Sequence, residues 1–203
     1  MKSVKSIFKI GKGPSSSHTM GPFKAVRHYM EYHHEADHLH VTLYGSLAAT
    51  GKGHLTDKAI EEAFHNIKKT GEVIIEWLPS ENLPEHPNGM TVAAADTDHQ
   101  EYDRWTYYSV GGGDIVCVDH PLDTEDEAEI YQMTTMQEIL DWCNSTGKSF
   151  WEFVEENEKD TPDFWEHLAL VWKVMQKAVE RGIDEEGALP GPLNLRRKAG
   201  SYY

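Results

Sequence analysis

The chain has 203 residues, enough for one or two domains with a buried core. Its 34 acidic and 19 basic residues give a formal charge of −15, which disfavours binding to nucleic acid and to anionic membranes. No apolar run approaches the roughly 18 residues of a membrane span, and the first six residues lack the apolar core of a secretory signal. We therefore expect a cytoplasmic protein whose partners include neither nucleic acid nor membrane.

Near the N-terminus, residues 11–22 place four hydroxyl groups and one imidazole before a predicted helix. The segment reads Gly-Lys-Gly-Pro-Ser-Ser-Ser-His-Thr-Met-Gly-Pro, and apolar residues at helical spacing continue from Met20 to Met30. Such a row offers donors to an anion at the start of a helix, but Ser17 or Thr19 could instead only cap that helix. The residues alone leave both interpretations open.

The predicted helix ends among His33, His34 and His38, where the helix dipole favours imidazoles. His34 and His38 are four residues apart, so a zinc site is the alternative interpretation. No third ligand is spaced to join them, and the segment has the composition of an exposed surface. We therefore predict no metal ligands in this chain.

A second glycine-bracketed stretch, residues 45–57, follows a predicted strand over residues 39–44. It is no P-loop, because five residues separate Gly45 from Gly51 and Gly53 follows Lys52. A helix is expected over about residues 57–69, with Gly71 as its stop, and a strand over 72–78. The order helix, strand, helix, strand lets both stretches face the same edge of a sheet.

The remaining elements predict an α+β fold with a mixed or antiparallel sheet flanked by helices. Strands are expected over residues 90–96, 102–110 and 114–118, with a bend at the triple glycine of residues 111–113. Cys117 and Cys143 lack metal or redox spacing and are interpreted as buried apolar residues.

After an acidic linker, residues 119–130, the composition favours helices. Two capping boxes are predicted, Thr135 with Glu138 and Ser149 with Glu152. A third helix is expected to start with Thr161 as its cap and to stop at Gly182. We divide the chain into a domain of residues 1–147, a helical connector of 148–182 and a tail of 183–203 that has too few apolar groups to fold alone.

Five segments of the chain closely resemble one family. They are the two glycine stretches, Asn-Gly-Met at residues 88–90, Thr-Tyr-Tyr-Ser-Val-Gly-Gly-Gly at 106–113 and Glu-Gly-Ala-Leu-Pro-Gly-Pro at 186–192. The family is the N-terminal beta domain of the iron–sulfur-dependent L-serine dehydratases, or L-serine ammonia-lyases. The resemblance implies a lyase of amino-acid degradation and gluconeogenesis that converts L-serine to pyruvate and ammonia, with a [4Fe-4S] cluster as Lewis acid. It also implies that residues 183–203 lead toward an alpha domain, or pair with a separate alpha subunit, that carries the cluster cysteines.

The resemblance further implies which residues form the site. His54 is the expected general base, although it could instead be a helix-entry residue bonded only to backbone. The substrate carboxylate is expected to bind the serine row, here defined as Ser15, Ser16, Ser17, His18 and Thr19, with Asn88 and Ser109 as further candidates. Because two cysteines cannot supply the thiolates of the cluster, this chain alone is expected to be inactive.

The fold is also similar to the allosteric substrate-binding domain of some D-3-phosphoglycerate dehydrogenases. This similarity supports an alternative function, a module that binds L-serine or a hydroxy acid and mediates dimerisation without catalysis. A homodimer is expected in either case.

Overall fold

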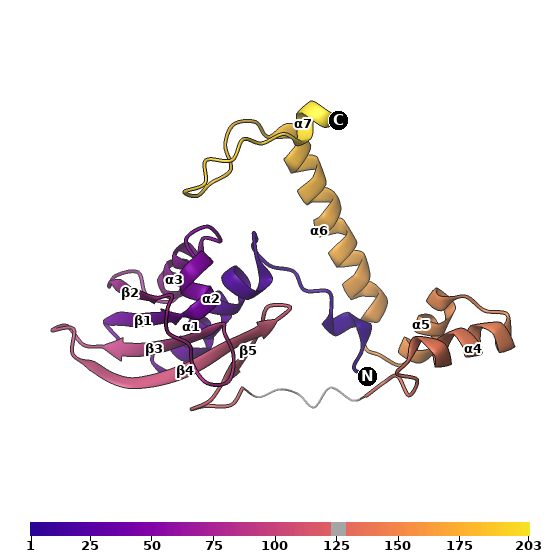
Figure 1. The fold of residues 1–203 in the computed structure, drawn as a ribbon, viewed down its shortest axis with the longest axis horizontal. Helices are drawn as coiled ribbons and strands as arrows, with labels where there is room; N and C mark the ends of the chain where they lie inside the picture. Colours follow the sequence, from indigo (N-terminus) through magenta and orange to yellow (C-terminus); the bar gives the residue numbers. More distant parts are fainter. Residues whose placement is uncertain (123–128) are drawn as a thin grey trace. The chain divides into compact units, whose positions relative to one another are not determined.

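The computed structural model describes residues 1–122 and 129–203, which form two compact units. Unit 1 comprises Met1–Ile10, Thr124–Glu185 and Ala199–Tyr203, and unit 2 comprises Gly11–Asp123 and Glu186–Lys198. Figure 1 traces the chain through both. The two units interleave along the sequence, and the division into residues 1–147, 148–182 and 183–203 stays a prediction.

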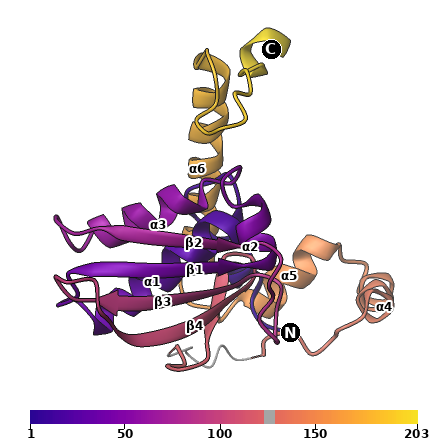
Figure 2. The same cartoon turned by 60° about the vertical axis from the view of Figure 1, so that its left-hand side comes forward.

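Unit 2 is built on a five-stranded sheet. Its strands are β1 (His38–Tyr44), β2 (Val73–Leu78), β3 (Gly89–Ala95), β4 (Glu101–Gly111) and β5 (Asp114–Cys117), in the order β2-β1-β3-β4-β5. Figure 2 shows four of these strands, β2, β1, β3 and β4, side by side. Strands β1 and β2 pair in parallel and the other neighbours pair antiparallel, so the predicted mixed sheet is confirmed.

Helices α1 (Gly21–Tyr32) and α3 (Thr56–His65) bury their apolar faces in the same core as one face of the sheet. The side chains of β1 alternate, so that Leu39, Val41 and Leu43 are buried with the helices. Helix α3 ends at His65, four residues before the predicted end. The chain turns back at Gly71, whose positive φ of 116° and close approach to the Asp37 carbonyl suit a residue without a side chain.

Two short helices occupy the glycine stretches. The serine row forms η2 (Ser16–Met20), a π-helical turn that leads directly into α1, and α2 (Gly45–Thr50) begins where β1 ends. The helix expected from the sequence began only at about residue 57, so α2 was not predicted. Gly45 makes the junction possible because it has φ +48° and lies against the carbonyl of Pro87 and the side chain of Asn82.

Unit 1 contains η1 (Val4–Ser6), α4 (Met136–Thr146), α5 (Phe150–Glu158), α6 (Phe164–Asp184) and α7 (Ala199–Tyr202). Both predicted capping boxes, on α4 and α5, are confirmed. The predicted start and stop of α6 are wrong. Helix α6 begins at Phe164, because the Thr161 hydroxyl donates to the Glu158 carboxylate at 2.7 Å and does not cap the helix. The helix continues through Gly182, where no neighbouring atom obstructs it.

Glu158 is the buried carboxylate of unit 1. Its two oxygens accept hydrogen bonds from the hydroxyls of Ser3 (2.7 Å), Tyr131 (2.6 Å) and Thr161 (2.7 Å) and from the backbone N–H of Val4 (2.7 Å). Burial alone would raise the pKa of Glu158, but these four donors stabilise the charged form and lower it. The carboxylate, which belongs to α5, thereby holds together the N-terminal segment, Tyr131 and the turn before α6.

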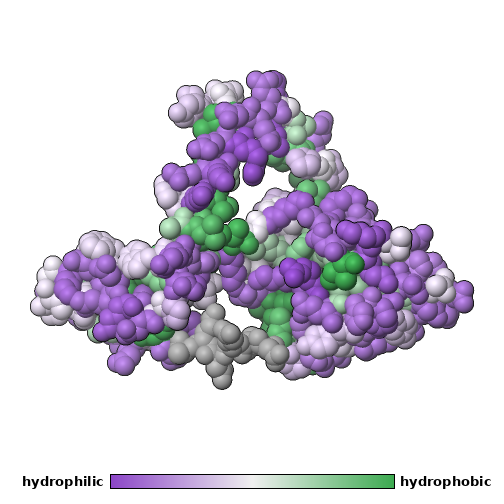
Figure 3. Space-filling model, turned by 180° about the vertical axis from the view of Figure 1, so that it is seen from behind, coloured by the Kyte–Doolittle hydropathy of each residue, from purple (hydrophilic) through white to green (hydrophobic). Residues whose placement is uncertain are grey.

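The surface seen in Figure 3 is predominantly hydrophilic, in agreement with the acidic composition. Exposed apolar side chains are frequent on α6, including Trp172 and Met175, which are 57% and 51% exposed. Among the described residues, no helix is both long enough and apolar enough to span a bilayer.

Candidate functional site

The two glycine stretches meet in unit 2 through a pair of reciprocal hydrogen bonds. The Thr19 hydroxyl donates to the backbone carbonyl of His54 at 2.8 Å, and the Thr56 hydroxyl donates to the backbone carbonyl of His18 at 2.5 Å. Both threonines are buried. Each imidazole-bearing segment is thus held by a hydroxyl of the other, and the two rings lie with their centroids 4.8 Å apart.

His18 is buried, and both its ring nitrogens have partners. Nδ1 accepts from the Ser17 hydroxyl at 2.9 Å, and Nε2 lies 3.2 Å from the Ser46 carbonyl and 3.1 Å from the Ser46 hydroxyl. A carbonyl oxygen can only accept, so this pattern assigns the proton to Nε2. Burial lowers the pKa of His18, the bond to the Ser46 carbonyl acts in the opposite direction, and charge on His54 lowers it further. His18 is therefore a neutral, fixed imidazole at neutral pH.

His54 is half-buried and has one ring nitrogen free for chemistry. Its Nδ1 lies 3.0 Å from the backbone carbonyl of Thr50, so Nδ1 carries the proton in the neutral ring. The lone pair is then on Nε2, which makes no hydrogen bond within the part of the chain that the structure describes. The backbone bond expected for a helix-entry residue is present, and it leaves a basic nitrogen available.

The hydroxyls of the serine row have different partners. Ser15 caps the π-helical turn by accepting from the His18 N–H at 3.1 Å, and its own N–H donates to the Thr19 hydroxyl at 3.2 Å. Ser17 bonds His18, and Ser16 is exposed. Capping and ligand binding are therefore compatible, because the hydroxyls of Ser16 and Ser15 can still donate when the turn is formed.

Asn88 and Ser109 lie together beside this region. The N–H of Ser109 donates to the Asn88 carbonyl at 3.0 Å, and the Asn88 side chain donates to the Ser109 carbonyl at 3.4 Å. The Ser109 hydroxyl is buried without a hydrogen-bond partner among the described residues and lies against Gly21 at the start of α1. An unpartnered buried hydroxyl at this position is free to receive a ligand or a water.

The second half of the chain returns to this site. In residues 186–198 the N–H of Leu189 donates to the Leu195 carbonyl at 2.7 Å, and Ala188 bridges Arg196. Gly191 lies against the side chain of Leu55, and Leu193 lies close to Gly53. The tail therefore packs beside the loop that carries His54.

Comparison with known proteins identifies the family of the chain. The sequence model described as Serine dehydratase beta chain matches residues 3–69 and 62–120. The chain belongs to this family. The match covers both glycine stretches and the strand that carries Ser109.

Curated relatives agree with the family assignment. The L-serine dehydratase of Haemophilus influenzae is 36% identical over 246 residues, covering 100% of this chain and 54% of that protein. L-serine dehydratase 1 of Escherichia coli and the L-serine dehydratase of Streptomyces coelicolor are each 35% identical, covering 98% and 97% of this chain. In both, 53% of the relative is covered, so this serine dehydratase beta chain spans about half the length of these relatives.

The beta chain does not fit an iron–sulfur cluster. Clusters of this kind are held by three or four thiolates, and the chain has two cysteines. Cys117 and Cys143 are both buried, and they belong to different units. Burial raises the pKa of Cys117, which opposes formation of the thiolate that iron requires. This chain therefore cannot hold such a cluster with its own thiolates, and cluster ligands outside the chain stay a prediction.

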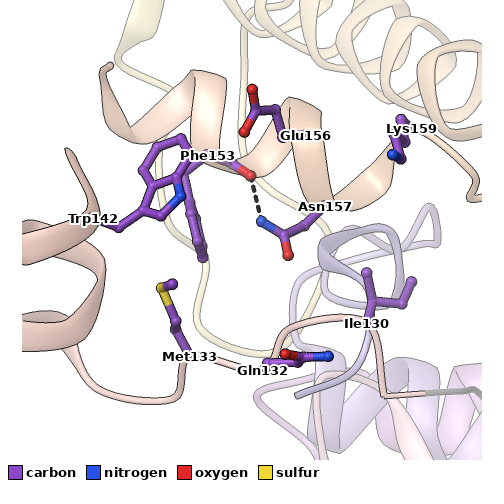
Figure 4. A pocket seen from close by; sticks show the side chains of 8 residues that line it. All are labelled: Ile130, Gln132, Met133, Trp142, Phe153, Glu156, Asn157 and Lys159. Atoms are coloured by element: carbon purple, nitrogen blue, oxygen red, sulfur yellow. Dashed lines mark hydrogen bonds between the residues drawn. The ribbon is translucent and has the colours of Figure 1, made fainter. Parts of the chain in front are cut away.

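A separate hollow of about 660 Å³ lies in unit 1 and is shown in Figure 4. Its wall includes Trp142, Phe153 and Asn157, whose side chain donates to the Phe153 carbonyl at 2.8 Å. The acidic side chain in the wall, Glu156, is paired with Lys148. The hollow lacks an imidazole or a free nucleophile in its lining, so the His18–His54 region is the better candidate for chemistry.

Three residues of the site were not predicted: Ser46, Thr50 and Thr56. Ser46 bonds the ring of His18 through both its carbonyl and its hydroxyl, and its N–H donates to the Pro87 carbonyl at 3.1 Å. It thus connects His18 to the loop that carries Asn88. The available signal was its place immediately after Gly45, at the end of β1.

Proposed function

We propose that this beta chain is the N-terminal portion of an L-serine ammonia-lyase and supplies the base and the carboxylate-binding groups of its site. The observation that carries the proposal is the free Nε2 of His54, held 4.8 Å centroid to centroid from a neutral His18 and beside the serine row, in a chain of this family. The substrate is L-serine, and the products are pyruvate and ammonia.

The proposed role of His54 is to remove the Cα proton of L-serine. When Nε2 takes this proton, the electron pair of the Cα–H bond forms the Cα–Cβ double bond, and the Cβ–O bond breaks as hydroxide leaves. The resulting aminoacrylate tautomerises to an imine, and water hydrolyses it to pyruvate and ammonia. The bond from Nδ1 to the Thr50 carbonyl directs the lone pair onto Nε2 and stabilises the imidazolium that forms.

The serine row and its neighbours have two proposed roles. Ser15 and Ser16, with Ser109 and Asn88, donate to the carboxylate of the substrate, while Ser17 donates to Nδ1 of His18 and orients that ring. His18 stays neutral, because a proton on His54 disfavours a second proton 4.8 Å away. Thr19 acts through the backbone of His54 and is a positioning residue.

A second polypeptide segment has to assist the departure of hydroxide, which is a poor leaving group. The resemblance to the iron–sulfur-dependent enzymes assigns this assistance to a [4Fe-4S] cluster, and its thiolates belong to an alpha domain or alpha subunit. We propose that the beta chain assembles with that partner and that the active enzyme is a homodimer of such pairs.

The test compares the purified beta chain alone with the same chain coexpressed with, or joined to, a cysteine-bearing alpha chain. Pyruvate formation from L-serine is followed by a coupled lactate dehydrogenase assay, and iron is measured in both preparations. We expect turnover and bound iron only in the combined preparation. Turnover by the chain alone, or a combined preparation that binds iron and yet leaves L-serine unchanged, would overturn the proposal.

A binding module is the second candidate function, favoured by a donor set that is unfit for the cluster. In that case the hydroxyl-rich site binds a small carboxylate without converting it. Titration calorimetry of the chain with L-serine and with D-3-phosphoglycerate separates the two candidates. Tight binding of D-3-phosphoglycerate together with inactivity of the combined preparation supports the binding module.

A further inference from the structure

The candidate site with His54 lies at one end of strand β1. At the other end, three residues with side chains that can bind a metal lie together. His38 is the first residue of β1, Glu72 directly precedes β2, and His99 lies in the turn between β3 and β4. One ligand atom from each lies within 4.8 Å of the ligand atoms of the other two.

The register of the sheet explains why these residues meet. Leu39 pairs with Val73 in the parallel ladder, which places Glu72 beside His38. His38 pairs with Ala95 in the antiparallel ladder, so the turn that follows β3 comes back next to it. The N–H of Glu72 donates to Nδ1 of His38 at 3.0 Å, and the rings of His38 and His99 stack with centroids 4.0 Å apart.

In and beside the cluster, two buried ring nitrogens have no hydrogen-bond partner among the described residues. Nδ1 of His99 is buried and has no hydrogen-bond partner among the described residues, while its Nε2 lies 3.9 Å from a carboxylate oxygen of Glu72. Nε2 of the neighbouring His40 is likewise buried and unpartnered within the described ranges. Buried polar atoms are nearly always satisfied, so a concentration of unsatisfied imidazole nitrogen indicates a missing ligand.

We propose that His38, Glu72 and His99 form a binding site for a divalent transition metal ion, with zinc as the best match. Two imidazoles and one carboxylate are borderline ligands that suit zinc and its neighbours, whereas calcium and magnesium prefer oxygen alone. Tetrahedral zinc ligands at about 2.0–2.1 Å from the metal are about 3.3 Å apart. The ligand atoms therefore have to approach one another by at most about 1.5 Å, which the 70% exposed Glu72 and the 40% exposed His99 can do by rotation.

Metal binding at His38 has a specific structural consequence. Since Nδ1 accepts from the Glu72 N–H, the neutral ring carries its proton on Nε2. To coordinate a metal, the ring has to give up this hydrogen bond or turn over. The amide of Glu72 thus reports occupancy of the site directly.

The site is independent of the proposed lyase function. A seven-residue strand is about 20 Å long, and His38 and the His54 region lie at opposite ends of β1. Failure of zinc binding leaves the lyase proposal intact, and the reverse also holds.

The experiment titrates zinc chloride into the full chain without an affinity tag, using calorimetry, and repeats the titration with Co²⁺ to record its visible absorption. We expect one ion per chain, with affinity reduced at least about 100-fold in His99→Ala, because loss of even an outer-shell partner costs 10–100-fold. His34→Ala is the matched control. His34 is four residues before His38 and 79% exposed, and its removal is expected to leave binding unchanged.

Further measurements keep the proposal falsifiable where His99→Ala is poorly folded. Glu72→Gln changes an exposed side chain without changing its size, and it is also expected to weaken zinc binding. Zinc is expected to shift the amide resonance of Glu72 in a ¹H–¹⁵N spectrum of the wild-type chain. Absence of stoichiometric binding, equal weakening by His34→Ala, or an unmoved Glu72 amide would overturn the proposal.

Discussion

Each unit of the molecule buries a polar cluster, and the two clusters differ in how completely they are satisfied. In unit 1, four donors fill the oxygens of Glu158. In unit 2, His18 is bonded at both ring nitrogens, but Nε2 of His54 and the hydroxyl of Ser109 have no hydrogen-bond partner among residues 1–122 and 129–203. A network in which every polar group has a hydrogen-bond partner stabilises the fold. A polar group without a partner can bind a substrate or accept a proton.

The largest expected effect is on the proposed lyase activity, measured in the proposed assembly with an alpha chain. Replacing His54 by Gln keeps a donor for the Thr50 carbonyl and removes the basic Nε2, so kcat is expected to fall by about 10²–10⁴. Stability is expected to change little. The control is His65→Gln, an exposed histidine at the end of α3. A kcat within a few-fold of wild type would assign the base elsewhere.

The corresponding change in unit 1 is expected to act on stability alone. Glu158→Gln removes the charge that four donors stabilise, which we expect to cost about 2–4 kcal/mol of unfolding free energy. Urea unfolding followed by tryptophan fluorescence measures this, since Trp142, Trp151, Trp165 and Trp172 lie in unit 1. The exposed neighbour Glu155, replaced by Gln, is the control. A cost equal to that of the control would contradict a stabilising role for Glu158.

A smaller effect is expected from the reciprocal threonine bonds. Thr19→Val and Thr56→Val each remove a buried hydroxyl donor and leave a carbonyl unpaired, at about 1–2 kcal/mol each. The double variant is expected to cost less than the sum, because the two bonds fix the same pair of segments. Thermal unfolding of the four proteins completes the cycle. Strict additivity would show that the two bonds act independently.

The smallest expected effect is a pH dependence of the stability of unit 2. Burial is the main cause that lowers the pKa of His18 below 6.5, so the unfolded chain binds more protons than the folded chain just below that pH. Stability is therefore complete above about pH 6.5 and is lost as pH falls toward the folded pKa. Comparing urea midpoints at several pH values for wild type and His18→Gln measures this. The same slope in both proteins would remove His18 as its source.

The sequence predicted those features that depend on neighbouring residues. The two capping boxes, the strands and the proximity of His54 to the serine row follow from local spacing and from helices that start at one sheet edge. The helix at residues 45–50 could not be read in the same way, because it depends on the space that Gly45 leaves for Asn82 and Pro87. Thr161 was misassigned for a similar reason, since its hydroxyl is taken by Glu158.

The candidate site likewise combines residues that local sequence predicts with residues whose role depends on contacts distant in the chain. Its imidazoles and hydroxyls are recognisable as a linear pattern, but Ser46 gains its role only from a contact with His18, 28 residues away in the chain. Glu72 and His99 are further examples, because only the register of the sheet brings them to His38. Spacing along the sequence paired His38 only with His34, which is exposed and lies outside this cluster.

The course of the chain has a practical consequence for dissecting the protein. The polypeptide leaves unit 2 at residue 123, builds most of unit 1, and returns with residues 186–198 to pack on Leu55 and Gly53. A shortened gene that stops after the sheet would therefore delete part of the wall beside His54. Conversely, a protease nick within residues 186–198 would loosen the loop that holds this histidine while the sheet itself stays whole.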